Sequence, residues 1–428
     1  MSMNNLIPKG ASYELRRERT KSSSVHYSGN NFERISSTDN IAQALRLLYE
    51  GKLSTVVSSK PDSIDDMVKQ AVETVRYGPS YDETFAEKAD IKQLNLVDDA
   101  DMSAEQMIDV MCRLVADLQS IDSRLVVSGS LSRTVTETAL QTSNGFDHSY
   151  RKSVWNCGAR LSFVQGDDRL GLMAGESSMS SDFDLKKIRD ELAQKLEWAK
   201  NIVSFEAGAY PVIFTPGQVP FVLNPVLQSL NGMAIQRKIS PWCDKLGQEL
   251  LDPKLTLVDD GSLDNSWTSR PFDAEGTPTQ RNTLVQNGRI KDILLDRKVA
   301  AKLGKKSSGN AGAMGPVPNF LMMDAGSKSL DDMIKSIDCG MIIDGSMGAW
   351  SGNPYAGIVT GTISMGLKVV NGKIVGRVKD CMFTVNAFEH LAKHFVACSK
   401  ERAYEQMMRG SAALLPYVML NEVVISAK

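Results

Sequence analysis

Residues 258–310 read VDDGSLDNSWTSRPFDAEGTPTQRNTLVQNGRIKDILLDRKVAAKLGKKSSGN, a dense run of turn formers and acids followed by more regular sequence. Within it, Asn287-Gly288 lies between two β-rich runs at residues 282–285 and 290–295. An Asn-Gly pair favours a tight turn with positive φ at both central residues, which matches the twist of the flanking strands. The segment therefore predicts a β-hairpin close to a turn-rich Phe-Asp-Ala-Glu-Gly-Thr-Pro core.

The C-terminal half carries further strand signals. Asn371-Gly372 separates residues 366–370 from residues 374–378 within a glycine-rich region, and this predicts a second hairpin. A short apolar strand is expected at residues 210–214, and a final strand at residues 417–426. Together these elements predict a β-rich C-terminal domain built on a mixed sheet.

The N-terminal half shows what looks like an internal duplication. Its first copy is expected to contain short strands and a closing helix, at residues 13–19, 23–27, 32–36, 42–49, 53–58 and 63–77. A second copy repeats this order and closes with a helix at residues 184–200. We therefore expect a two-domain α+β protein, with a β-rich duplicated N-terminal domain at residues 1–205 and the mixed-sheet domain at residues 206–428.

Bulk properties limit the classes of partner. The formal net charge of −2 gives no reason to expect nucleic acid or an anionic membrane. Residues 1–20 are polar and lack the apolar core of a secretory signal, and no long apolar run predicts a membrane helix. The six cysteines have no CxxC spacing, which is typical of buried thiols in a reducing compartment. These observations predict a cytoplasmic protein.

Several short motifs follow one another in a fixed order from residue 211 to residue 374. Each alone is a weak turn signal, but the set in this order is specific. The motifs are PVIFTPG (211–217), VDDG (258–261), FDAEGTPTQR (272–281), LVQNGRIKDILLDRKVAAKLG (284–304), SSGN (307–310) and VNGKI (370–374). With them the chain resembles the TldD/PmbA family, also labelled modulators of DNA gyrase, whose members are understood as intracellular metalloprotease subunits.

The resemblance implies two kinds of subunit. One carries a His-Glu-x-x-x-His zinc motif on the helix after the Pro-Gly, with a further cysteine ligand near the C-terminus. Here that helix, which we expect to be capped by Asn224 with Pro225 in its first turn, reads Asn224-Pro225-Val226-Leu227-Gln228-Ser229. The C-terminal Cys-Gly-Lys segment is replaced by RGSAALLPYVML at residues 409–420. The chain therefore resembles the PmbA-like, or TldE-like, subunit, which implies no metal and no other cofactor.

Two histidines have the i, i+4 spacing of a possible metal pair. His390 and His394 lie on a helix expected at residues 387–399, and both point away from its apolar face. The nearby Glu389 precedes the first histidine, which is the wrong order for a zinc protease. A solvated helix face is the favoured interpretation, and a metal site is the alternative.

The carboxylates of Asp273 and Glu275 could form an acid and base pair, since they bracket a single residue. The structural alternative is a turn stabilised by side-chain acceptors, in which Gly276 supplies a backbone conformation that other residues avoid. We favour the structural interpretation. A role in lining a peptide cleft or a subunit contact is the alternative, and its candidate residues are Asp273, Glu275, Gly276, Thr277 and Asn310.

The favoured functional hypothesis is a non-zinc subunit of a cytoplasmic metalloprotease complex that acts on peptides or small unfolded proteins. Its expected partner is a zinc-bearing TldD-like subunit, which would carry out the cleavage. A homo-oligomeric binding or scaffold protein without protease activity is the main alternative. A hydrolase that uses residues not identified by any motif is a third hypothesis.

Overall fold

The structure is a computed structural model that describes residues 6–166, 168–407 and 411–427. By packing, the chain divides into two compact units, each built from two segments. Unit 1 comprises residues 1–192 and 263–278, and unit 2 comprises residues 193–262 and 279–428. The division falls inside a helix, so the domain limits expected at residues 205 and 206 stay a prediction.

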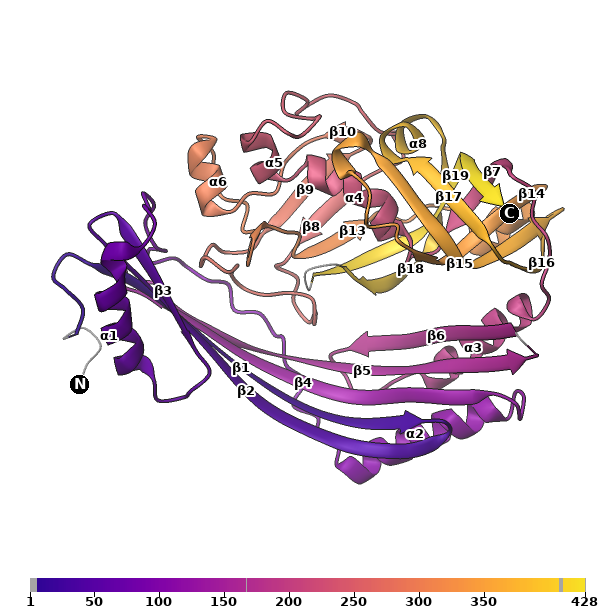
Figure 1. Ribbon diagram of the computed structural model, residues 1–428, viewed down its shortest axis with the longest axis horizontal. Coiled ribbons are helices and arrows are strands. Elements are labelled where there is room, and N and C mark those ends of the chain that lie inside the picture. Colours follow the sequence, from indigo (N-terminus) through magenta and orange to yellow (C-terminus); the bar gives the residue numbers. More distant parts are fainter. Residues whose placement is uncertain (1–5, 167, 408–410, 428) are drawn as a thin grey trace. The chain divides into compact units, whose positions relative to one another are not determined.

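The described part of unit 1 forms a six-stranded antiparallel sheet whose long strands are drawn as curved ribbons in Figure 1. Its strands are β1 (Ser12–Ser28), β2 (Asn31–Tyr49), β3 (Lys52–Ser58), β4 (Val126–Thr142), β5 (Asp147–Gln165) and β6 (Asp168–Ser178). They pair in the order β3-β2-β1-β4-β5-β6. Three strands followed by a helix occur twice in the chain, which agrees with the expected duplication without testing it.

The expected pair of short strands at residues 13–19 and 23–27 is a single strand, β1. Residues between them stay extended because β1 pairs with β2 on one side and β4 on the other along almost its whole length. Asp167, between β5 and β6 in the sequence, lies outside the described residues.

Helices cover the sheet of unit 1. They are α1 (Ile64–Thr74), the 3₁₀ turn η2 (Val75–Tyr77), α2 (Ala104–Gln119) and α3 (Leu185–Ala199), within which the two units divide. α1 packs on β2 and β3, and α2 packs on β1 and β4 (Figure 1). The start of α2 carries the capping box of Ser103 and Gln106, whose side chains each accept a backbone N–H of the other.

Unit 2 is a mixed sheet with short helices. The strands are β7 (Gly208–Phe214), β8 (Leu257–Asp260), β9 (Arg281–Gln286), β10 (Arg289–Ile290), β11 (Ala311–Gly312), β12 (Gly315–Pro316), β13 (Phe320–Met323), β14 (Cys339–Met347), β15 (Ile358–Val370), β16 (Lys373–Val378), β17 (Cys381–Asn386), β18 (Phe395–Gln406) and β19 (Ala412–Ala427). The helices are α4 (Val219–Ser229), α5 (Gly232–Gln236), α6 (Arg297–Lys302), α7 (Leu330–Lys335), the 3₁₀ turn η3 (Pro354–Ala356) and α8 (Ala387–Lys393).

The strands of unit 2 close on themselves through β7. This strand pairs in parallel with β14 and antiparallel with β19, while the path β19-β17-β15-β14 completes the ring. The result is a barrel-like arrangement, with parallel and antiparallel pairs as the mixed-sheet prediction expected. Both predicted hairpins are confirmed, because Asn287, Gly288, Asn371 and Gly372 all have positive φ between paired strands.

The predicted helix at residues 387–399 is too long. α8 ends at Lys393, and the chain enters β18 at Phe395. From Phe395 onward the segment pairs with β19, so sheet hydrogen bonds replace the helical ones.

The six cysteines are free thiols. Cys157, Cys381 and Cys398 are buried as expected, whereas Cys112 and Cys339 are exposed and Cys243 is intermediate, so the prediction of buried thiols holds for only part of the set. Burial, with a smaller contribution from Glu176, raises the pKa of the Cys157 thiol to about 12. A thiol so rarely ionised is chemically inert at neutral pH.

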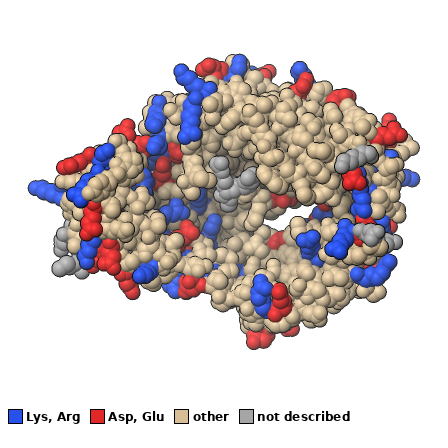
Figure 2. All heavy atoms as spheres, viewed as in Figure 1, with Lys and Arg blue, Asp and Glu red and all other residues tan. Residues whose placement is uncertain are grey.

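On the face seen in Figure 2, Lys and Arg are interspersed with Asp and Glu, in keeping with the small net charge. Within the described residues, no helix combines the length and apolarity needed to cross a bilayer.

The β9–β10 turn generates a stability prediction. An added Cβ at Gly288 would lie 2.1 Å from the carbonyl oxygen of Leu251, whereas one at Gly304 would meet nothing within 4 Å. Both glycines have positive φ, so each change to alanine costs about 1 kcal/mol of backbone strain. Gly288→Ala adds a clash with the backbone, and we expect it to lower the free energy of unfolding by about 3 kcal/mol in total.

Urea denaturation of both variants measures the difference. Gly304→Ala is the matched control, because it carries the strain without the clash. Equal losses in the two variants would show that the chain next to Gly288 gives way at little cost.

Candidate functional site

Helix α4 occupies the position at which the zinc motif was sought. It begins at Val219 after Gln218, with Pro220 in its first turn, so the predicted start at Asn224 and Pro225 is wrong. Pro220 suits the first turn because the backbone N–H that it lacks would have no helical partner there. Pro225 instead lies inside the helix and removes the N–H that would pair with the carbonyl of Phe221.

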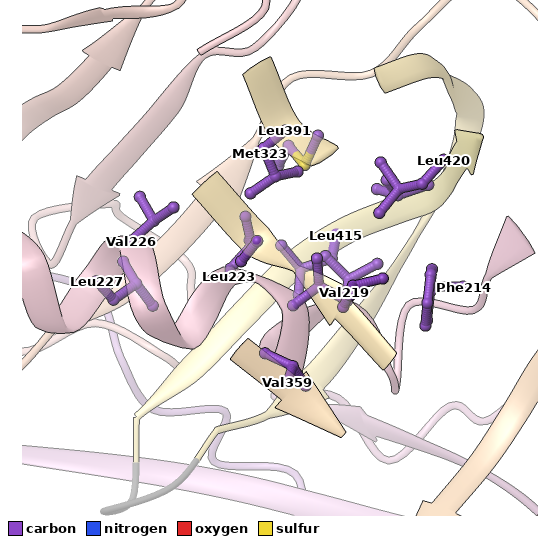
Figure 3. Packing of buried hydrophobic residues seen from close by; sticks show 14 of the residues in the cluster. Phe214, Val219, Leu223, Val226, Leu227, Met323, Val359, Leu391, Leu415 and Leu420 are labelled. Atoms are coloured by element: carbon purple, nitrogen blue, oxygen red, sulfur yellow. The ribbon is translucent and has the colours of Figure 1, made fainter. Parts of the chain in front are cut away.

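The apolar side of α4 anchors the helix to the core of unit 2. Val219, Leu223 and Val226 are each at most 1% exposed. Figure 3 shows Val219 beside Leu415 of β19, with Leu223 and Val226 further along the same helix. This packing fixes which residues of α4 can face the opposite side.

The three positions that would carry the zinc ligands and the catalytic glutamate hold Asn224, Pro225 and Ser229. Asn224 is half-buried, while Pro225 is buried. Ser229 is 0% exposed, and its hydroxyl donates to the carbonyl oxygen of Pro225 at 2.7 Å. A catalytic zinc requires imidazole, thiolate or carboxylate ligands around an open position, and these residues do not fit one.

A pocket of about 280 Å³ opens beside the half-buried side of α4. The pocket is lined by residues of α4, of the proline-rich turn at residues 316–318 and of the loop that carries Trp350. The described lining residues, none of them ionisable, are Pro220, Phe221, Asn224, Leu227, Gln228, Asn231, Leu294, Pro316, Val317, Pro318, Trp350, Pro354, Met407 and Ser411. Such a pocket offers hydrogen bonds and apolar contact but no general acid or base at neutral pH.

Two pairs of side chains shape the pocket. Gln228 Nε2 donates to Asn224 Oδ1 at 3.3 Å, one turn of α4 apart. The rings of Phe221 and Trp350 are tilted by 43° with centroids 6.1 Å apart, and Trp350 is 53% exposed. An exposed tryptophan at the rim of a pocket is typical of a binding surface.

A buried polar network lies behind the pocket wall. Asp259 is 0% exposed, and its carboxylate accepts the backbone N–H groups of Asn319 at 2.6 Å and Phe320 at 2.9 Å. The same carboxylate accepts Asn310 Nδ2 at 2.6 Å. Asn310 Oδ1 in turn accepts from Ser308 Oγ at 2.7 Å and Asn282 Nδ2 at 3.1 Å. The VDDG and SSGN motifs therefore meet in one network.

Asn310 extends this network to the pocket. Its carbonyl oxygen accepts the N–H of Val317 at 2.9 Å, and its Nδ2 donates to the Val317 carbonyl at 3.0 Å. From α5, the N-cap residue Asn231 donates its Nδ2 to the Pro316 carbonyl at 2.8 Å. Asn310 is 0% exposed and holds this wall from behind, and a contact role for it stays a proposal.

The FDAEGTP turn belongs to unit 1. Asp273 is 2% exposed, and its Oδ1 accepts the backbone N–H groups of Glu275 and Thr277, each at 2.9 Å. Gly276 has a φ of +78°, and an added Cβ would lie 2.8 Å from the Cβ of Ala86. Phe272 packs edge-on against Phe146, with ring centroids 5.3 Å apart.

These contacts favour the structural interpretation for Asp273 and Gly276. An acid and base pair is disfavoured too, because the Asp273 carboxylate is occupied by the turn's own backbone. Glu275 and Thr277 are half-buried, and a contact role for them stays a proposal.

The histidine pair differs from expectation. His390 is 8% exposed, so its place on a solvated helix face is wrong. Its Nδ1 lies 2.9 Å from the Asn386 carbonyl oxygen and its Nε2 lies 3.2 Å from that of Glu422. Both nitrogens therefore face main-chain oxygens. Nowhere in the described chain do three or more His, Cys, Asp or Glu side chains gather as a metal site.

Sequence reasoning missed the pocket's own lining. Phe221, Gln228 and Trp350 carry no motif, and Asn224 was considered only as a helix cap and as a position that lacks a zinc ligand. The exposed tryptophan in a glycine-rich loop was a usable signal. Residues 409 and 410 of the C-terminal RGSAALLPYVML segment lie outside the described residues.

Comparisons with known proteins agree on one family. The PmbA/TldA metallopeptidase C-terminal domain matches residues 207–427, and the PmbA/TldA metallopeptidase domain 1 matches residues 13–75. The first match alone covers more than half of the chain.

Individual relatives and solved structures are similar to this chain over most of its length. An uncharacterized protein of Methanocaldococcus jannaschii is 26% identical over 81% of this chain and 81% of its own length. A metalloprotease TldD homolog of Buchnera aphidicola is 26% identical over 68% of this chain, which spans 64% of that homolog. The crystal structure of TldE from Thermococcus kodakarensis superposes with a TM-score of 0.90 at 21% identity, covering 99% of this chain and 98% of that one.

The network around Asp259 generates a prediction for stability. Asp259→Asn replaces one carboxylate oxygen with an NH₂ group that faces N–H donors. We expect the free energy of unfolding to fall by about 3 kcal/mol, because a buried network would be left with clashing donors. Asp324→Asn, at an exposed carboxylate, should change it by less than about 0.5 kcal/mol. Thermal and urea denaturation compare the two, and similar small losses in both would contradict a structural role for the network.

Proposed function

The chain belongs to the PmbA/TldD metallopeptidase family, and we propose that within it the chain serves as a subunit without catalytic zinc. In this proposal it joins a zinc-bearing, TldD-like subunit in a cytoplasmic complex that degrades peptides or small unfolded proteins. The partner cleaves the peptide bond, and this chain helps to enclose and hold the substrate.

The observation that carries the proposal is the composition of α4. A zinc peptidase needs metal ligands and a carboxylate that activates the attacking water. At the corresponding positions this chain has an amide, a proline and a buried serine whose hydroxyl is bonded within the helix. The described lining of the adjacent pocket contributes no ionisable group either.

Substrate holding is supported by the sheet of unit 1. Among the described strands, β6 ends the strand order of this sheet and pairs with β5 alone. An extended peptide can add to such an edge through main-chain hydrogen bonds, which depend little on peptide sequence. This mode suits a protein that handles peptides of varied sequence.

Zinc content and peptidase activity of the purified chain test the proposal. The chain alone should bind no stoichiometric zinc after dialysis and should not hydrolyse casein or unstructured peptides, because α4 offers neither ligands nor a base. Elemental analysis and a peptide-release assay with and without chelator give the readouts. Stoichiometric zinc with chelator-sensitive hydrolysis by the chain alone would overturn the proposal.

Affinity capture from native lysate tests the partner. A relative that carries His-Glu-x-x-x-His should co-purify with the chain, and the peptidase activity should then follow the complex. Recovery of only the chain itself, as a homo-oligomer without peptidase activity, would favour the scaffold alternative.

The turn at residues 273–277 provides a test of the contact role. Glu275→Ala should leave the melting temperature unchanged, since the turn is fixed by Asp273, and should weaken assembly or substrate capture several-fold. Glu73→Ala, at an exposed position of α1, is the control. Identical assembly, capture and peptidase activity in the two variants would assign the turn a structural role only.

A further inference from the structure

We propose that the pocket beside α4 binds an uncharged segment of an extended peptide, with one apolar side chain inserted and one main-chain amide bonded to Asn224 and Gln228. The inference rests on the proposed function for its class of ligand, since the peptide is the substrate of the complex. It assigns to this chain a peptide-binding site at the position where a catalytic subunit would hold its metal.

The size and lining of the pocket limit the ligand. A volume of about 280 Å³ accommodates one large side chain with part of its backbone. Burying a charged group there would be costly, because no described lining residue can neutralise it. A free carboxylate, a phosphate or a metal ion is therefore disfavoured relative to a neutral group.

The amide pair supplies the complementary hydrogen-bonding groups. One bond joins Gln228 Nε2 to Asn224 Oδ1. Among the described residues, the side-chain NH₂ group of Asn224 and the side-chain oxygen Oε1 of Gln228 have no further hydrogen-bond partner. If both amides were flipped, the pair would still present one donor and one acceptor. A peptide group offers the matching acceptor and donor.

The apolar part of the pocket is already formed. Phe221 and Trp350 provide aromatic walls, and Pro220 and Pro318 are conformationally restricted. The turn that carries Pro318 is fixed from behind by Asn310, as described above. A rigid pocket loses little conformational entropy on binding, which favours affinity for a short segment.

Binding to the isolated full-length chain tests the proposal. The probe is N-acetyl-Ala-Phe-Ala-amide, which has a neutral backbone and one aromatic side chain. N-acetyl-Ala-Asp-Ala-amide is the charged comparison. Titration calorimetry or ligand-observed NMR should detect the phenylalanine peptide and a much weaker aspartate peptide. No binding of the phenylalanine peptide up to about 10 mM would overturn the inference.

Variants locate the site. Trp350→Ala should weaken binding by about tenfold, as expected for an aromatic anchor, and Gln228→Leu by about fivefold through the lost hydrogen bond. Gln248→Leu, an exposed glutamine of unit 2, is the control and should bind as the native chain does. Melting temperatures close to native show that the variants are folded. Equal binding by all three variants would place the peptide elsewhere and overturn the assignment.

The two proposals fail in different ways. The proposed subunit role fails if the purified chain itself binds zinc and hydrolyses peptides, or if no zinc-bearing partner co-purifies with it. The proposed peptide-binding pocket fails only if the peptide titrations show no binding at this site, and the zinc content of the chain does not affect that test.

Discussion

The buried carboxylate of Asp259 is the interaction on which the loops of unit 2 depend. It accepts main-chain donors from the start of β13 and the side chain of Asn310, which in turn holds the turn at residues 316–318. A buried carboxylate is tolerated only when its oxygens are hydrogen-bonded, so sequence segments far apart must converge on it. The VDDG and SSGN motifs therefore belong to one hydrogen-bond network. That network also holds one wall of the pocket beside α4 in place.

In this chain the residues of the buried network lie outside helix α4, where the zinc motif was sought. The network and the hairpins require specific residues for backbone reasons, and they are present in this chain. The metal site requires only a few side chains on one helix, and these can change without loss of the fold because α4 is anchored by its opposite face. A pocket lined by neutral side chains can therefore lie beside this helix, and such a lining suits binding better than catalysis.

Much of the fold could be predicted from local chemistry. The Asn-Gly turns are encoded within a few residues, and both predicted turns appear as expected. The capping box at Ser103 is equally local, because it joins residues three positions apart. The start of α4 was misplaced because Pro220 and Pro225 lie only five residues apart and each suits the first turn of a helix. Packing places Pro220 in that turn. His390 was misassigned because β18 replaces the predicted end of its helix. The contacts of Asn310 with Asp259 and of Trp350 with Phe221 span long sequence separations, which periodicity does not reveal.

The central claim is that this chain contributes a peptide-binding pocket, and no catalytic zinc, to a complex whose metal lies in its partner. Anomalous diffraction at the zinc edge from crystals of the assembled complex tests it most directly. The account predicts a zinc peak within the His-Glu-x-x-x-His motif of the partner and none beside Asn224. A peak coordinated by residues of α4 in this chain would contradict it.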